Sequence, residues 1–136
     1  MWRCVEVIKG MIRIGIVGSD GRWWKNGDER RVKEIIRRIV RYYIRKYGEV
    51  EVVSGGCLLG GVDVWAEEVG RELGCKVTVF RARGRGWRWF KERNDKIARY
   101  VDVLYCIDKA GRRWSGGRYT LTKARELGKW VKLIEV

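Results

Sequence analysis

Glycine-rich segments that precede predicted helices are the first sign of chemistry in this sequence. They occupy residues 18–21, 54–61 and 115–117. Glycine permits positive φ and lets a backbone approach a phosphate closely, and the free N–H groups and dipole at a helix start favour anions. The three segments therefore predict a site for a phosphorylated ligand. The alternative for each segment taken alone is a tight turn without any ligand.

Arginine and tryptophan are concentrated in the same predicted loops. A guanidinium group binds phosphate through paired hydrogen bonds, and an exposed indole ring stacks on a nucleobase with about 1–3 kcal/mol per base. Alternatively, the tryptophans cover loops or form a dimer interface while the arginines are solvated. The candidates for contacts to nucleic acid or to a stacked base are Trp23, Arg83, Arg85, Trp87 and Trp114.

Two aspartates are the weak candidates for catalysis, and the catalytic residue of any reaction stays unknown. The chain has no histidine, which removes the usual base of a Ser/His/Asp triad and the commonest zinc ligand. Cleavage of an N-glycosidic bond would need a carboxylate near the anomeric carbon, and Asp20 and Asp63 are placed for this. Asp63 stands at a predicted helix start, where the simpler expectation is a helix cap.

Asn94 is a polar residue on a predicted apolar stripe. Phe90 lies four residues before it and Ile97 three residues after it, so all three are expected on one face of a helix. Burying an amide is costly unless its hydrogen bonds are satisfied. Asn94 must therefore bond either to a neighbouring loop or to a ligand.

The charge of the chain is strongly positive. There are 31 Lys and Arg against 17 Asp and Glu, which gives a formal net charge of +14 and favours polyanions, phosphorylated ligands or an acidic partner. The absence of Pro, Gln and His, with only two Asn and 35% charged residues, is typical of proteins from hot environments. Adaptation to heat would explain the high proportion of charged residues, but it would not explain why the net charge is positive.

Four cysteines stand far apart, at positions 4, 57, 75 and 106, without a C-x-x-C pair. This spacing argues against a structural zinc site and against a small disulfide scaffold, so we expect a cytoplasmic protein with no metal and no cofactor. No run of 18 apolar residues occurs, and we expect no membrane partner.

Hydrophobic periodicity predicts five strands that alternate with four helices. The alternation predicts a Rossmann-like three-layer α/β/α sandwich around a mainly parallel five-stranded sheet, formed by a single domain over residues 1–136. Loops that follow parallel strands meet at one rim, which would bring the glycine, arginine and tryptophan residues together. Residues 4–8 are a candidate for an extra N-terminal edge strand. The predicted strands are 11–17, 50–53, 77–80, 103–107 and 131–134, and the predicted helices are 28–47, 62–73, 89–100 and 118–127.

Four short motifs in this order resemble the SLOG superfamily of Rossmann-like proteins. They are Ser54-Gly55-Gly56, Gly61-Val62-Asp63, Arg93-Asn94 and Ser115-Gly116-Gly117 with Thr120. That superfamily includes the DprA/Smf single-strand-binding proteins and the "lonely guy" phosphoribohydrolases, and the pattern is most similar to the small YspA/YpsA-related branch. The resemblance covers about residues 12–136.

The resemblance implies a ligand pocket at the rim. It implies that Arg93 and Asn94 reach the pocket from the third helix and that the motif around Ser115 holds a phosphate. One departure is Lys123, which stands where the phosphoribohydrolases carry their catalytic Glu and puts that reaction in doubt. The candidate ligand-binding residues are Gly18, Ser19, Asp20, Gly55, Gly56, Gly61, Asp63, Arg93, Asn94, Ser115, Gly116, Gly117 and Thr120.

Three functions are compatible with these observations. The first is binding of a nucleotide or nucleotide-derived phosphorylated ligand, as a sensor or carrier or as an N-glycosidic-bond hydrolase. The second is DprA-like binding of single-stranded nucleic acid, which the net charge and the tryptophans support. The third is a structural protein without activity. In each case we expect a homo-oligomer, in the simplest form a dimer.

Overall fold

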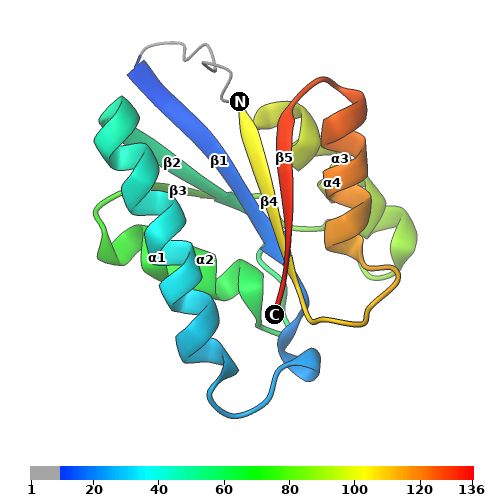
Figure 1. Cartoon of the computed structure of the whole chain (residues 1–136). Helices are drawn as coiled ribbons and strands as arrows, with labels where there is room; N and C mark the ends of the chain where they lie inside the picture. Colours follow the sequence, from blue (N-terminus) through cyan, green and yellow to red (C-terminus); the bar gives the residue numbers. More distant parts are fainter. Residues whose placement is uncertain (1–9) are drawn as a thin grey trace.

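The computed structural model of the chain describes residues 10–136, so the predicted edge strand at residues 4–8 lies outside the described residues. Five strands and four α-helices alternate along the chain, with one short 3₁₀ helix after the first strand (Figure 1). The elements are β1 (Met11–Gly18), η2 (Gly21–Trp23), α1 (Asp28–Tyr47), β2 (Glu49–Ser54), α2 (Val62–Glu72), β3 (Lys76–Val79), α3 (Trp87–Tyr100), β4 (Val103–Asp108), α4 (Gly116–Glu126) and β5 (Trp130–Glu135).

The five strands form one sheet in the order β3-β2-β1-β4-β5, and all four pairings are parallel. Helices α1 and α2 cover one face and α3 and α4 the other, which confirms the predicted Rossmann-like three-layer sandwich (Figure 1). The chain runs outward from β1 to β3 and then crosses back to β4 beside β1. This reversal is a topological switch point, where open parallel sheets bind ligands outside the carboxyl ends of the strands.

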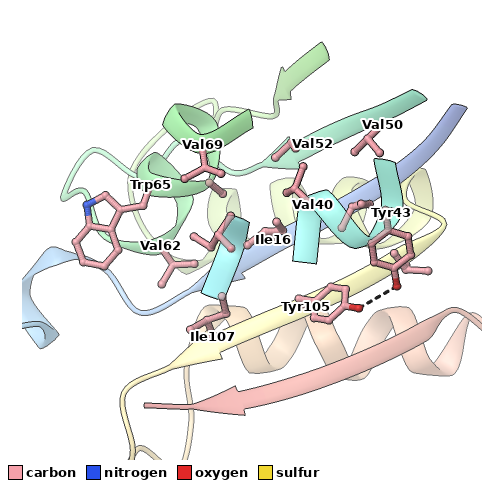
Figure 2. Packing of buried hydrophobic residues seen from close by; sticks show 14 of the residues in the cluster. Ile16, Val40, Tyr43, Val50, Val52, Val62, Trp65, Val69, Tyr105 and Ile107 are labelled. Atoms are coloured by element: carbon pink, nitrogen blue, oxygen red, sulfur yellow. Dashed lines mark hydrogen bonds between the residues drawn. The ribbon is translucent and has the colours of Figure 1, made fainter. Parts of the chain in front are cut away.

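Each face of the sheet has its own apolar cluster. Alternating residues of β4 show the division, because Tyr105 packs toward α1 and α2 while Leu104 and Cys106 pack toward α3 and α4. Figure 2 shows the first cluster, in which the hydroxyls of Tyr43 and Tyr105 are hydrogen-bonded at 2.9 Å. The bond satisfies two polar groups inside an otherwise apolar layer. Because helices bury both faces of the sheet, the sheet is a rigid support for its loops.

Helix α1 has the predicted bounds because its apolar residues recur at helical spacing. Val32, Ile36, Val40 and Tyr43 are fully buried on one stripe. Gly48 ends the helix with φ of +89°, and its N–H donates to the carbonyl of Ile44. The other boundaries agree with the predictions to within two residues.

Helix α3 differs from the prediction in a way that affects the site. It begins at Trp87, two residues before the predicted start, so Trp87 belongs to its first turn. Phe90, which was expected to pack inward with Asn94 and Ile97, is 39% exposed at the rim, whereas the latter two are buried. Phe90 instead lines the cavity at the carboxyl ends of the strands. None of the helices in residues 10–136 is long and apolar enough to cross a membrane.

Candidate functional site

A cavity of about 730 Å³ opens at the carboxyl ends of the strands. All four strand-to-helix loops contribute to its walls, as the predicted rim requires, and it lies across the switch point between β1 and β4. Most of the residues predicted to bind a ligand line this cavity: Gly18, Asp20, Gly56, Asp63, Arg93, Asn94, Ser115, Gly116, Gly117 and Thr120.

Arg93 and Asn94 connect three elements on the α3 side of the cavity. Arg93 Nη1 donates to the carbonyl of Gly55, and Arg93 Nε donates to Asn94 Oδ1 at 2.8 Å. Asn94 Nδ2 in turn donates to the carbonyl of Gly116 at 3.4 Å. Asn94 therefore satisfies its buried amide with a neighbouring loop and a neighbouring side chain, and the chain of bonds fixes the Arg93 guanidinium at the cavity wall.

The start of α4 forms the adjoining part of the wall. Ser115 caps the helix, since its Oγ accepts from the backbone N–H of Arg118 at 3.0 Å and donates to the buried carboxylate of Asp108 at 2.7 Å. Gly117 lies directly against β1, because an added Cβ would be 3.2 Å from the Cα of Gly18. The positive end of α4 is thus held at the switch point, where its first amides can meet an anion.

Asp63 is a buried carboxylate in the cavity wall, 7% exposed. Burial raises its pKa to about 6, an effect that the Arg93 charge opposes and the Glu67 charge reinforces. The expectation that Asp63 caps α2 is wrong: the cap position is Gly61, and the Asp63 carboxylate accepts from the backbone N–H groups of Cys57 and Gly18. Asp63 therefore joins two rim loops and can change protonation near neutral pH.

Asp20 has a different environment. Its carboxylate forms paired hydrogen bonds with the Arg22 guanidinium at 3.0 Å and caps η2 through the Arg22 amide. These bonds lower the pKa of Asp20, so it stays ionised at neutral pH. Among residues 10–136, no group of three or more Cys, Asp and Glu side chains could share a metal ion.

Three predicted residues lie behind the cavity wall. Gly55 supplies the carbonyl that Arg93 binds, and Gly61 supplies a left-handed turn at φ of +84° where a Cβ would strike the Ser19 carbonyl. Ser19 is 1% exposed, donates to Asp108 Oδ1 at 2.8 Å and accepts from Arg112 Nη1 at 3.1 Å. These three residues shape the site by supporting the groups that line it.

The cavity lining carries an excess of positive charge. Its lining includes five arginines and two aspartates, and one of those aspartates is already paired with Arg22. Arg112 lies over the ring of Trp23, with Cζ 3.9 Å from the ring centroid. Arg85 lines the cavity as predicted. The arginines of the lining are Arg22, Arg81, Arg85, Arg93 and Arg112.

The cavity lining also contains exposed apolar side chains, which the sequence-based analysis mostly missed. Leu58 and Leu59 of the β2–α2 loop are 87% and 52% exposed, and Phe90 of α3 lines the same cavity. Trp87 and Trp114 line the cavity as predicted, with ring centroids 5.1 Å apart in an edge-to-face arrangement. The sequence did contain a signal for this apolar surface, namely two adjacent leucines in a glycine-rich loop. Large apolar residues that are exposed side by side in a loop indicate a binding surface.

Two of the predicted stacking candidates lie elsewhere. The Arg83 guanidinium forms a bidentate pair with Glu92, at 2.7 and 2.8 Å, and lies over Trp89, so it points away from the cavity. Trp23 lies outside the cavity, against Arg112. Arg83 lies outside the cavity lining, and a sequence does not show which loop cations pair with a carboxylate on the following helix.

Comparison with known proteins shows the fold. No protein-family model and no curated protein matches the sequence. Among solved structures, the chain is similar to the molybdenum cofactor carrier protein of Chlamydomonas reinhardtii, with 17% identity and a TM-score of 0.65. The match covers 90% of this chain and 76% of that one. The likeness extends over nearly the whole sandwich, and it establishes a shared Rossmann-like architecture.

Proposed function

We propose that the protein binds a nucleotide or a nucleotide-derived phosphorylated ligand in the rim cavity and acts as its carrier or sensor. The observation that carries this proposal is the combination of two chemistries in the lining of one cavity. Arg93, Arg112 and the start of α4 supply positive charge, and exposed leucine and aromatic side chains supply apolar surface. A ligand with an anionic end and a flat, weakly polar end matches both.

The phosphate is expected at the start of α4. The amides of Gly116 and Gly117 lie in the first turn, where helix N–H groups lack intrahelical partners, and the fixed guanidinium of Arg93 lies close by through Asn94. Charge-assisted hydrogen bonds from both sources would hold a phosphate without any metal ion. The base would then lie toward Phe90 and Trp114.

A carrier or sensor fits the site better than a hydrolase. Asp63 is the single lining carboxylate that can hold a proton near neutral pH, but its oxygens are occupied by two loop amides. Lys123, at the position of the phosphoribohydrolase glutamate, is outside the cavity lining. The structural neighbour is named as a carrier protein, which agrees with binding without turnover. Membership in the SLOG superfamily, near its YspA/YpsA-related branch, is part of this proposal.

Binding of single-stranded nucleic acid is the second candidate, and the outer surface of α1 favours it. Arg30, Arg31, Arg41 and Arg45 are exposed there, and none of them forms an ion pair with another described residue. Such a row would follow a phosphate backbone and would make binding strongly salt-dependent. A homodimer also stays a prediction, which light scattering at several protein concentrations would test.

The experiment that separates the two candidates is a titration of the purified protein with nucleoside mono-, di- and triphosphates and with a labelled 12-nucleotide single strand, each at low and high salt. Thermal stability and tryptophan fluorescence are the readouts, since Trp87 and Trp114 line the cavity. Saturable stabilisation by a mononucleotide that changes little with salt supports the cavity as the site. Strand binding that collapses at high salt, with no response to mononucleotides, would overturn the nucleotide proposal.

A further inference from the structure

A second hollow of about 530 Å³ lies beside the cavity, on the other side of the β4–α4 loop. We call it the outer hollow; it is lined by Trp23 and by residues 109–114. Arg112 and Trp114 line both the outer hollow and the cavity, so these two side chains form the border between them. The nucleotide site proposed above does not use the outer hollow.

Arg112 is held at this border by two contacts. Its guanidinium lies 3.9 Å from the ring centroid of Trp23, and its Nη1 donates to Ser19 Oγ at 3.1 Å. Ser19 is itself fixed by Asp108. Arg112 forms no ion pair within residues 10–136, although its charge helps to lower the pKa of Asp20 in the cavity lining. A cation with a fixed position that is shared by two adjacent hollows is placed to bind an anion that lies across the border.

The aromatic side of the border is equally fixed. Trp114 is 58% exposed, and it packs edge-to-face on Trp87, which in turn packs edge-to-face on Tyr119 at 5.1 Å. Trp114 therefore presents indole surface in a set orientation. Because it borders both hollows, one flat group in the cavity and a second in the outer hollow can both meet aromatic surface.

The outer hollow also carries excess positive charge. Its lining contains Lys109, Arg112 and Arg113 and no carboxylate. Lys109 is paired with Asp28 at 3.2 Å, whereas Arg113 is exposed and forms no ion pair within residues 10–136. Arg113 and Arg112 thus leave two cations available to an incoming ligand.

We infer that the ligand consists of two nucleoside units joined through phosphate, with the first unit in the cavity, the linking phosphate on Arg112 and the second unit in the outer hollow against Trp23 and Trp114. This inference rests on the proposed function and extends it, since a mononucleotide would leave the outer hollow empty. The same chemistry is offered by a free dinucleotide and by the end of a single strand.

The test compares a 5′-phosphorylated mononucleotide, the corresponding 3′,5′-linked dinucleotide, a pyrophosphate-linked dinucleotide and a 12-nucleotide single strand. Affinities are measured by fluorescence titration at two salt concentrations. We expect a dinucleotide to bind about tenfold or more tightly than the mononucleotide, because it adds a charge-assisted contact and a stacked base. A strand that binds no more tightly than the dinucleotide points to a free dinucleotide, and a strand that binds far more tightly points to nucleic acid.

Two variants test whether the higher affinity of the dinucleotide depends on the outer hollow. Arg113→Ala and Trp23→Ala change residues that line the outer hollow alone. We expect each to remove most of the tenfold advantage of the dinucleotide. Mononucleotide affinity should stay within about twofold in Arg113→Ala, whereas Trp23→Ala also removes the ring that holds Arg112 and should lower that affinity further. Arg99→Ala is the control of equal charge, since Arg99 is an exposed residue near the other end of α3 and outside both hollows.

The outcomes separate this inference from the proposed function. Mononucleotide binding with no dinucleotide advantage, or an advantage that both variants retain, would overturn the two-unit ligand and leave the proposed function standing. Absence of any nucleotide binding would overturn the proposed function itself. Equal losses in Arg99→Ala and Arg113→Ala would show that general charge produces the advantage, and they too would overturn the inference.

Discussion

Arg93 donates a hydrogen bond to the backbone carbonyl of Gly55, 38 positions earlier in the chain, and this bond joins α3 to the loop after β2. The close approach depends on glycine, because a Cβ at position 55 would lie 2.8 Å from both the Arg93 guanidinium and the Asp63 carboxylate. The Arg93 guanidinium and the Asp63 carboxylate therefore both lie against Gly55, and this arrangement is possible because residue 55 has no side chain.

Replacing the Arg93 guanidinium tests the phosphate site. Arg93→Ala is expected to weaken binding of a phosphorylated nucleotide by about 10- to 100-fold, since a hydrogen bond to a charged group contributes about 1.5–3 kcal/mol. Isothermal titration calorimetry gives the affinity, and a thermal melt verifies that the variant is folded. Arg99→Ala serves as the control, and unchanged affinity in a folded Arg93→Ala protein would remove Arg93 from the site.

The two glycines that begin α4 are expected to respond in opposite ways to alanine. A Cβ at Gly117 would meet Cys106 Sγ at 2.9 Å and the backbone of Gly18 at 3.2 Å, so Gly117→Ala should lower the free energy of unfolding by about 1–3 kcal/mol. At Gly116 the nearest contact would be Asn94 Nδ2 at 3.4 Å. Gly116→Ala should therefore be neutral or stabilising by up to about 1 kcal/mol. Urea denaturation measures both, and equal effects would contradict the close packing of α4 on β1.

Protonation of Asp63 should make stability depend on pH. Burial raises its pKa to about 6, above the ordinary value of 3.8, so between these values the folded protein holds a proton that the unfolded chain has released. The contribution of Asp63 to stability is therefore present at pH 4 and is lost as the pH rises through 6. Asp63→Asn has no such titration. The difference in unfolding free energy between wild type and Asp63→Asn should shift in favour of the variant over this interval, and a constant difference would contradict the raised pKa.

Trp114 tests the aromatic side of the cavity. Because Trp114 is 58% exposed, Trp114→Ala should leave the melting temperature within a few degrees of wild type. Loss of a stacking surface should weaken nucleotide binding by about 5- to 100-fold, which corresponds to roughly 1–3 kcal/mol per base. Trp89→Ala is a suitable comparison, since Trp89 lies outside the cavity lining. Equal affinities for wild type and Trp114→Ala would place the base elsewhere.

The sequence predicts the fold well wherever one periodicity dominates. The stripe of α1, from Val32 to Tyr43, and its terminal Gly48 lead to the observed helix, and the alternation of strands and helices leads to a parallel sheet with one rim. Phe90 shows where the periodicity fails, because it lies on the predicted apolar face of α3 and yet is 39% exposed and lines the cavity. The periodicity predicts which face of a helix a residue occupies, and it does not predict whether that part of the face is covered.

The site is predictable to the extent that topology determines it. The rim brings together Arg93, Asn94 and the start of α4 because each follows or faces a strand end. Loop partners are not predictable in this way, since Arg83 pairs with Glu92 and Arg112 lies over Trp23 through side-chain conformations that no spacing indicates. The apolar surface formed by Leu58 and Leu59 is likewise a product of loop conformation.

The most direct test of the central claim is a two-dimensional ¹H–¹⁵N NMR titration of the labelled protein with a nucleoside monophosphate. Binding at the rim predicts the largest shifts at the amides of Gly56, Gly116 and Gly117, at the side-chain amide of Asn94 and at the indole N–H of Trp114. Residues on the outer surface of α1 should not move. Shifts confined to α1, or no shifts at millimolar nucleotide, would contradict the account.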